Sequence, residues 1–341
     1  MWGKDLRINA GVRLLQTDQT ISGYVTDPGE AKEYKHYANN YTEALPSVNL
    51  ALDLRDDVVL RAAASKTMTR PAPGDLAPGQ TLSFNGDQLT RGNPELKPYF
   101  SDNLDLGLEW YFAKRGTVSV NLWQKKVQGF TIVRNRQRPF GELGININAL
   151  AQVTRDSLTA LGGGDPNNAL VNVAMRENSD EIITLRGVEV SWLMPLDFLV
   201  RGLGINANYT YISQKSSETQ PQSPGYTGLG AAVTGLSPNT FNVTAYYERG
   251  RYSARTSFNY RDPYVSALGP QNNFPGDIWR IATYSLDASF SVRLNDTFKL
   301  TVEAGNLLND TSLTYVNQDK SLPWGGNAPG RNYAVGLQAT F

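Results

Sequence analysis

The sequence contains no cysteine, which excludes disulfide bonds, zinc–thiolate sites and cysteine nucleophiles. A chain without cysteine suits passage through an oxidising periplasm, although many cytosolic proteins also lack this residue. The acidic pairs Asp56-Asp57 and Asp180-Glu181 do not have the ligand spacing of an EF-hand and fit solvated turns better. We therefore expect no bound metal ion and no cofactor.

Long hydrophobic runs are also missing. No stretch approaches the ~20 consecutive apolar residues that a membrane-spanning helix needs. Only 40% of the residues are hydrophobic, but membrane β-strands alternate apolar and polar residues and therefore average to a moderate hydropathy. Lysine plus arginine equal aspartate plus glutamate at 32 each, so no net charge favours nucleic acid as a partner. The low hydropathy is therefore compatible with a membrane protein that crosses the bilayer with β-strands.

Alternation of apolar and polar residues with a period of two dominates the whole chain. In the run at 100–113, for example, Leu104 and Leu106 share one face and oppose Asp105 and Glu109. The pattern predicts about twelve strands, close to 5–26, 32–55, 57–69, 100–113, 116–136, 180–194, 200–217, 237–249, 250–262, 280–294, 297–316 and 329–341.

The connections between these runs alternate between short and long. Short turns are expected near 56–57, 113–116, 195–202, 248–251 and 295–296, and long polar stretches near 70–100, 137–180, 215–236, 262–280 and 316–329. Bacterial outer-membrane barrels have short periplasmic turns and long outer loops. Because every backbone group in hydrocarbon needs a partner, such a sheet must close. We predict an all-β, antiparallel transmembrane β-barrel, one domain over residues 1–341, in preference to a soluble β-sandwich.

The final strand carries a pattern of its own. Apolar residues recur at every second position up to a terminal aromatic residue: Tyr333, Val335, Leu337, Ala339 and Phe341. This pattern resembles the β-signal that the outer-membrane barrel assembly machinery recognises, and the alternative is an ordinary edge strand. We expect that machinery and outer-membrane lipid as partners, and the bacterial outer membrane as the location.

Several segments resemble one known family. They are residues 45–50 (LPSVNL), 61–71 (RAAASKTMTRP), 91–98 (RGNPELKP), 101–112 (SDNLDLGLEWYF) and 305–310 (GNLLND). Together with the final strand, they are similar in kind and in order to segments of the barrels of TonB-dependent receptors. The middle of the chain, near 113–300, carries no recognised motif.

This resemblance implies an outer-membrane receptor, not an enzyme, whose loops capture a scarce solute such as an oligosaccharide or an iron–siderophore complex. Members of the family have an N-terminal plug domain, a TonB-contact segment and about 22 strands. None of these leading parts is recognisable, and no signal peptide begins the sequence. We therefore expect an incomplete polypeptide that meets the TonB complex only through a missing N-terminal part. The alternative is a self-contained barrel of about twelve strands that acts as a pore.

Candidate ligand-binding residues are the aromatic residues of the long connections: Phe84, Tyr264, Phe274, Trp279 and Trp324. Aromatic platforms bind sugar rings and siderophore groups through apolar contact. The alternative is that Trp279 anchors the membrane interface and that the others pack within loops. Catalysis would need a base beside a nucleophile. The single histidine, His36, lies among Tyr and Lys and is expected at the surface, and neither Ser22 nor Ser47 has the surroundings of a nucleophile. We expect no catalytic residue.

Overall fold

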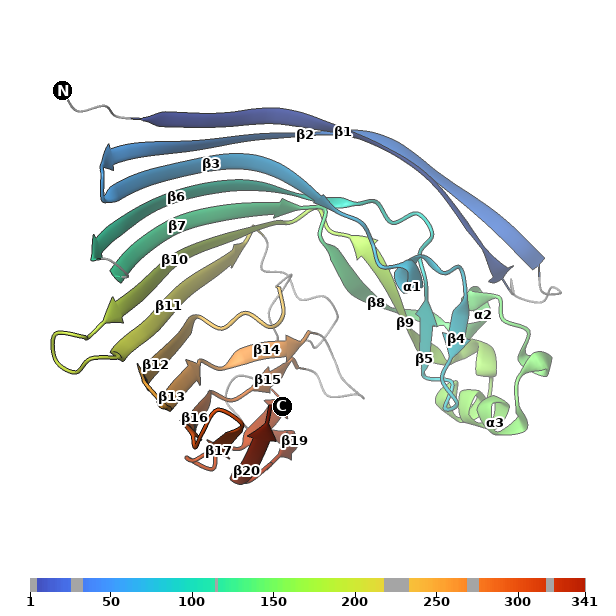
Figure 1. Ribbon diagram of the computed structural model, residues 1–341. Helices are drawn as coiled ribbons and strands as arrows, with labels where there is room; N and C mark the ends of the chain where they lie inside the picture. Colours follow the sequence, from blue (N-terminus) through green and yellow to red (C-terminus); the bar gives the residue numbers. More distant parts are fainter. Residues whose placement is uncertain are drawn as a thin grey trace.

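The computed structural model of the chain describes residues 5–25, 33–113, 116–217, 233–268, 276–316 and 322–340. These residues form one long, curved antiparallel sheet, with two smaller four-stranded sheets near one end of it (Figure 1). No helix in this described part is both long enough and apolar enough to cross a membrane.

The large sheet has twelve strands, and its strand order follows the chain. Its members are β1 (Leu6–Val25), β2 (Glu33–Arg55), β3 (Val58–Thr69), β6 (Tyr99–Ala113), β7 (Gly116–Gln128), β10 (Ile182–Pro195), β11 (Leu203–Ser216), β12 (Asn239–Arg249), β13 (Tyr252–Arg261), β16 (Thr283–Arg293), β17 (Phe298–Gly305) and β20 (Asn332–Ala339). Every neighbouring pair is antiparallel. Each of the twelve predicted runs contains one of these strands, so the predicted antiparallel β architecture is confirmed.

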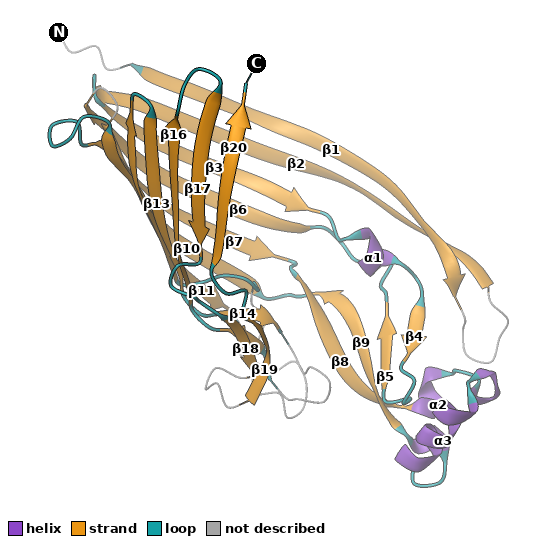
Figure 2. Cartoon of the chain, turned by 60° about the horizontal axis from the view of Figure 1, so that its bottom comes forward, coloured by secondary structure: helices purple, strands orange, loops and turns teal. Residues whose placement is uncertain are grey.

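The connections also alternate as predicted. The short hairpin turns gather at one end of the sheet, where β1 begins and β20 ends, and the longer connections leave from the other end (Figure 2). Hydrogen bonds from side chains stabilise the short turns. The indole of Trp110 donates a hydrogen bond to Asp57 in the β2–β3 turn (3.0 Å), and Asn295 accepts one from the amide of Phe298 (2.8 Å).

The strand register keeps side chains of one kind on one face of the large sheet. Leu106 pairs with Ala62 on β3 and with Leu122 on β7, whereas Asp105 pairs with Ala63 and Trp123. We call these the apolar face and the polar face. Large apolar side chains on the apolar face remain exposed, as in Leu106, at 47%. An apolar surface that spans so many strands fits contact with lipid better than contact with water.

The large sheet is open at both edges. β1 and β20 end the strand order and do not pair with each other. A sheet edge cannot face hydrocarbon, because its backbone groups would have no hydrogen-bond partner there. The alternative of a self-contained pore of about twelve strands requires a pairing of β1 with β20, and the described strands do not make it.

The second sheet consists of β4 (Gln80–Leu82), β5 (Gln88–Arg91), β9 (Leu170–Asn178) and β8 (Thr131–Pro139). With it lie α1 (Pro73–Leu76), α2 (Phe140–Leu143), α3 (Gln152–Leu161) and 3-10 helices at Ile147–Ala149 and Pro166–Asn168. We call these connections, residues 70–98 and 129–181, the loop unit. The prediction of one strand over 116–136 was wrong at its end, because Gly129 adopts a φ of 72° and β8 turns away into the loop unit.

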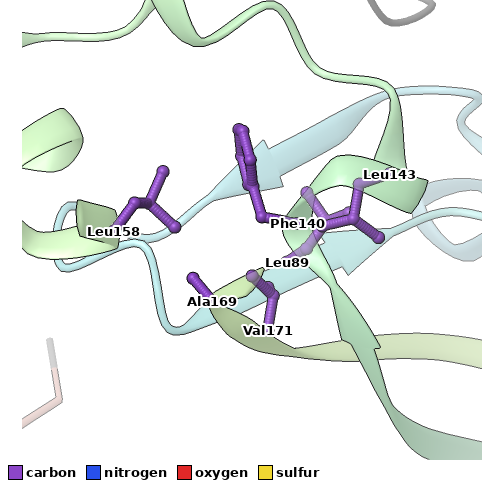
Figure 3. Close-up of a cluster of buried hydrophobic side chains, with 6 residues drawn as sticks. All are labelled: Leu89, Phe140, Leu143, Leu158, Ala169 and Val171. Carbon is purple, nitrogen blue, oxygen red and sulfur yellow. The ribbon is translucent and has the colours of Figure 1, made fainter. Parts of the chain in front are cut away.

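The loop unit has a hydrophobic core of its own. Six buried side chains pack together in it: Leu89, Phe140, Leu143, Leu158, Ala169 and Val171 (Figure 3). β5 and β9 pair in parallel, which joins the two connections into one folded body. The polar stretches expected near 70–100 and 137–180 are therefore structured and interlocked.

The third sheet consists of β14 (Tyr264–Ala267), β15 (Ile278–Arg280), β18 (Ser312–Val316) and β19 (Leu322–Asn327). The predicted single strand over 297–316 breaks at Asn306 and Asn309, which have φ values of 51° and 57°. Asparagine tolerates this left-handed conformation better than most side chains. The chain thus leaves β17 and enters the third sheet at β18.

Candidate functional site

The segment 91–98 joins the two connections of the loop unit to each other. Asn93 donates a hydrogen bond to the carbonyl of Arg176 (2.9 Å), and Asn178 accepts one from the amide of Lys97 (2.9 Å). A Cβ at Gly92 would lie 1.8 Å from the carbonyl oxygen of Ala77, so only glycine fits there. These contacts give the segment a structural role.

Ion pairs line the polar face of the large sheet. Arg61 donates to Glu109 at 2.8 and 3.1 Å, and the hydroxyl of Tyr111 donates to the same carboxylate at 2.8 Å. Arg7 forms a bidentate pair with Asp53 at 2.7 and 2.8 Å. These pairs border a cavity of about 540 Å³. Their solvent exposure indicates a hydrated surface rather than a dry core.

A second polar cavity, of about 660 Å³, lies where the large sheet meets the third sheet. We call it the arginine cavity. It is lined by Thr240, Asn242, Asn259, Tyr260, Arg261, Arg280, Thr283, Tyr284, Ser285, Asn306, Asp310, Ser312, Asn327 and Pro329. The polar faces of β12, β13 and β16 supply one wall, and the connections around Asn306 supply the other.

Two arginines of this cavity lie near one aromatic ring, that of Tyr264. The guanidinium of Arg261 is 3.9 Å from the ring centroid of Tyr264, and that of Arg280 is 6.0 Å from it. Arg261 also donates to Ser237 Oγ (2.7 Å). The Nε of Arg280 is buried and has no hydrogen-bond partner in the described part of the chain. A buried donor of this kind is costly unless something accepts from it.

The structure brings some of the predicted ligand residues together. Tyr264 and Trp279 lie on the paired strands β14 and β15, and Trp324 lies on β19 of the same sheet. Phe84 lies apart, 67% exposed in the turn between β4 and β5 of the loop unit. Phe274 is outside the described residues. Ligand binding by these residues stays a prediction.

Sequence reasoning missed the two arginines. Arg261 ends the polar face of β13 just before Tyr264, and Arg280 directly follows Trp279. The sequence did contain a signal for them, since each arginine lies close in sequence to a candidate aromatic residue. Their convergence on Tyr264 depends on the pairing of Tyr264 with Arg280, which no local pattern indicates.

Two side chains in the connections have shifted pKa values. Hydrogen bonding to the carboxylate of Glu177 raises the pKa of Arg136 in the loop unit. Burial raises the pKa of the Tyr315 phenol in the third sheet. Both groups therefore keep their protons at neutral pH.

The predicted assembly signal lies on an edge strand. Tyr333, Val335, Leu337 and Ala339 share one exposed face of β20, which pairs only with β17 among the described strands. Phe341 is outside the described residues. Recognition by assembly machinery stays a prediction.

Ser22 and His36 face each other across β1 and β2, with Ser22 Oγ 2.8 Å from His36 Nδ1. His36 is exposed, as predicted, but its serine neighbour was not expected. The ring of His36 packs edge-on against Tyr34 at 5.1 Å, and no described carboxylate orients it. A nucleophile–base pair without an orienting group or an oxyanion hole lacks most of a hydrolase site.

Acidic side chains do not converge in the described part of the chain. No three His, Cys, Asp or Glu side chains there form a set that could hold a metal ion. The expectation that Glu181 is solvated was wrong, because this side chain is buried and accepts a hydrogen bond from Ser216 (2.7 Å).

A family model described as TonB dependent receptor-like, beta-barrel, matches residues 2–307. Among solved structures, the chain is similar to a mutant ferric enterobactin receptor from Pseudomonas aeruginosa, with a TM-score of 0.60, 15% identity and coverage of 98% of this chain and 45% of that one. It is similar to the copper transporter OprC, with a TM-score of 0.61, 16% identity and coverage of 99% and 46%. It is also similar to the ferric-catecholate import receptor Fiu from E. coli, with a TM-score of 0.62, 12% identity and coverage of 98% and 42%.

No curated protein sequence matches the chain. The chain spans about half the length of the solved structures that it matches, or 45%, 46% and 42% of the three described above. At these sequence identities, the similarity to solved structures shows only that the fold is shared. The family model matches most of the sequence and therefore shows the family.

Proposed function

The chain belongs to the family of TonB-dependent receptor-like β-barrels, and from this premise we propose that it forms part of an outer-membrane receptor for a small anionic solute. The iron complex of a siderophore is the solute class that fits best. The proposal places the apolar face against outer-membrane lipid and the polar face toward the passage. Energy would come from the TonB complex. The described residues contain no separate plug domain, and the proposal assigns contact with TonB to none of them.

The arginine cavity carries this proposal. Its volume of about 660 Å³ suits a small molecule, since ligand pockets measure roughly 300–1,000 Å³. Guanidinium groups pair with carboxylate, catecholate or phosphate oxygens through charge-assisted hydrogen bonds. The Nε of Arg280 has no hydrogen-bond partner among the described residues, which leaves this guanidinium short of acceptors.

Aromatic side chains would complete the contact. The ring of Tyr264 packs against the guanidinium of Arg261, with that of Arg280 6.0 Å from its centroid, and Trp279 lies on the neighbouring strand. Trp324 and Phe84, together with Phe274, remain proposed contacts for a solute approaching from the connections. A neutral oligosaccharide would use the aromatic rings but would leave the two guanidinium charges without a counterpart.

The names of similar proteins support this solute class. Two of the three are receptors for ferric enterobactin and for ferric catecholates. The third is a copper transporter.

The test compares two double variants of the native polypeptide that carries these residues, purified from outer membranes in detergent. Arg261→Gln with Arg280→Gln removes both charges of the arginine cavity. Arg255→Gln with Arg293→Gln removes two arginines of the large sheet that do not line the arginine cavity. The probes are ferric enterobactin, as a ferric catecholate, and maltohexaose, as a neutral oligosaccharide, with binding measured by fluorescence quenching.

We expect the first double variant to bind the ferric catecholate at least about tenfold more weakly, since a hydrogen bond to a charged group contributes about 1.5–3 kcal/mol. The second should bind it as the wild type does. Equal affinity of all three proteins for the ferric catecholate would contradict the proposal, and so would tight binding of maltohexaose alone.

A further inference from the structure

Basic side chains form a row on the apolar face of the large sheet, near the ends of the strands that carry the long connections. The register places Lys66, Asp102, Lys126, Thr184 and Lys215 side by side on β3, β6, β7, β10 and β11. Arg186 lies two residues further along β10. These residues share a face with Leu104 and Leu106 because side chains at every second position point the same way. We call Lys66, Lys126, Arg186 and Lys215 the basic row.

The charges of the basic row are not balanced. Asp102 is the one carboxylate beside these four cations in the paired strands, and none of the four makes an ion pair with a described residue. Lys66 lies over the ring of Phe100 at 4.5 Å, and Arg186 donates only to the neutral side chain of Gln124 (2.8 Å). On the polar face, by contrast, Arg7 and Arg61 each hold a carboxylate.

An apolar hollow of about 460 Å³ adjoins the basic row. On the apolar face its lining residues are Val48, Leu50, Ala62, Ala64, Leu104, Leu106 and Leu122, and it ends at Gln124 and Arg186. The hollow exists because β3 presents the small side chains of Ala62 and Ala64 between the larger ones of β2 and β6. Because mainly apolar side chains line it, hydrocarbon would cover it more favourably than water.

We propose that the basic row and the adjoining hollow form a binding site for a lipid with a phosphorylated headgroup. The phosphate would lie on Lys126, Arg186 and Lys215, and one acyl chain would lie in the hollow. This site is on the face opposite to the arginine cavity, so it is separate from solute uptake. The membrane leaflet concerned is the one nearest the long connections.

The geometry fits one phosphate group. Neighbouring strands are about 4.8 Å apart, which separates the backbones of Lys126 and Lys215 by about 10 Å with Thr184 between them. Two flexible lysine side chains can converge over that span while their stems cover apolar surface. Exposed cations on a lipid-facing surface are unfavourable without an anion, and a headgroup phosphate supplies one.

The test uses native mass spectrometry of the native polypeptide in a mild non-ionic detergent. The probes are a hexa-acylated disaccharide lipid with two phosphates, the same lipid after removal of both phosphates, and inorganic phosphate. The variant is Lys126→Gln with Lys215→Gln. The matched control is Lys125→Gln with Arg255→Gln, which removes two charges from the polar face.

We expect the phosphorylated lipid to bind the wild type and the control equally, and the variant about thirtyfold more weakly, since each basic residue near an anionic surface contributes about 1 kcal/mol. The dephosphorylated lipid should bind all three proteins weakly. Equal affinity of wild type and variant for the phosphorylated lipid would overturn the proposal. Full competition by inorganic phosphate would overturn it as well, because the site would then bind an anion without needing the acyl chain.

Discussion

The loop unit and the large sheet are held together in different ways. The loop unit buries six apolar side chains, among them Leu158 and Phe140, as a small water-soluble domain does (Figure 3). The large sheet leaves its largest apolar side chains exposed on one face and its ion pairs on the other. Its strands are joined by continuous backbone hydrogen bonds from β1 to β20. One chain therefore contains a body stabilised by its own core and a wall whose apolar face depends on the surrounding solvent.

The first prediction breaks the core of the loop unit. Leu158→Ala should destabilise that unit by about 2–5 kcal/mol, because Leu158 is fully buried and the change leaves a cavity. Leu161→Ala on the same helix, where the side chain is 52% exposed, should cost less than about 0.5 kcal/mol. Hydrogen exchange of residues 129–181 measures both, and equal protection in the two variants would contradict the assigned core.

The second prediction tests which face of the large sheet contacts lipid and which contacts water. Leu122→Lys on the apolar face should destabilise the protein by about 2–4 kcal/mol in lipid vesicles, if this position lies near the middle of the bilayer. Asn121→Lys, one residue away on the polar face, should have a small effect because the lysine would reach water. Urea unfolding in vesicles gives both values. A larger cost for Asn121→Lys would reverse the assignment of the two faces.

The third prediction concerns the junction between the large sheet and the third sheet. Asn306 donates to the carbonyls of Asp310 (3.1 Å) and Gly330 (3.0 Å), and its Oδ1 accepts from the amide of Asp310 (2.7 Å). Asn306→Ala should cost about 1–3 kcal/mol through lost hydrogen bonds and left-handed strain. Asn306→Gly should cost about 1 kcal/mol less, because glycine adopts a positive φ without strain. Thermal unfolding of the two variants ranks them, and the opposite order would contradict this account.

The smallest effect is expected from an ion pair of the polar face. Arg61→Met should change the stability of the protein by at most about 1 kcal/mol, since the arginine side chain is half exposed and its pairing with Glu109 is screened by water. The cost should shrink further at high salt. Chemical unfolding at two ionic strengths provides the measurement. A loss as large as that of Leu158→Ala would mean that the polar face is dry.

The large sheet could be predicted from the sequence because one of its faces is apolar and the other polar along every strand. Apolar and polar residues therefore alternate in the sequence, as Leu104 and Asp105 do. The loop unit could not be predicted in this way. Its helix α3 packs Leu158 against Gly86 and donates a hydrogen bond from Thr154 to the carbonyl of Phe84 (3.0 Å), both in another connection, and no local pattern contains these contacts. The breaks at Gly129 and Asn306 were missed because alternation continues beyond them.

The candidate site was predicted only in part, for a similar reason. Aromatic residues in long connections pointed to Tyr264, Trp279 and Trp324, which the structure gathers in one sheet. The charges of the arginine cavity depend on the meeting of Arg261 and Arg280, which follows from the pairing of β14 with β15. The basic row was equally hidden, because only the register shows that lysines of different strands are neighbours.

The parallel pairing of β5 with β9 sets an order of events during biogenesis. β5 precedes β6 and β9 follows β7, so the two paired segments are separated by a complete hairpin of the large sheet. Contacts between segments so distant in the chain form slowly, because a long loop must close first. Both connections must therefore be brought to the same end of the β6–β7 hairpin before the loop unit can fold. Completion of the loop unit is thus a non-local and comparatively slow step in folding.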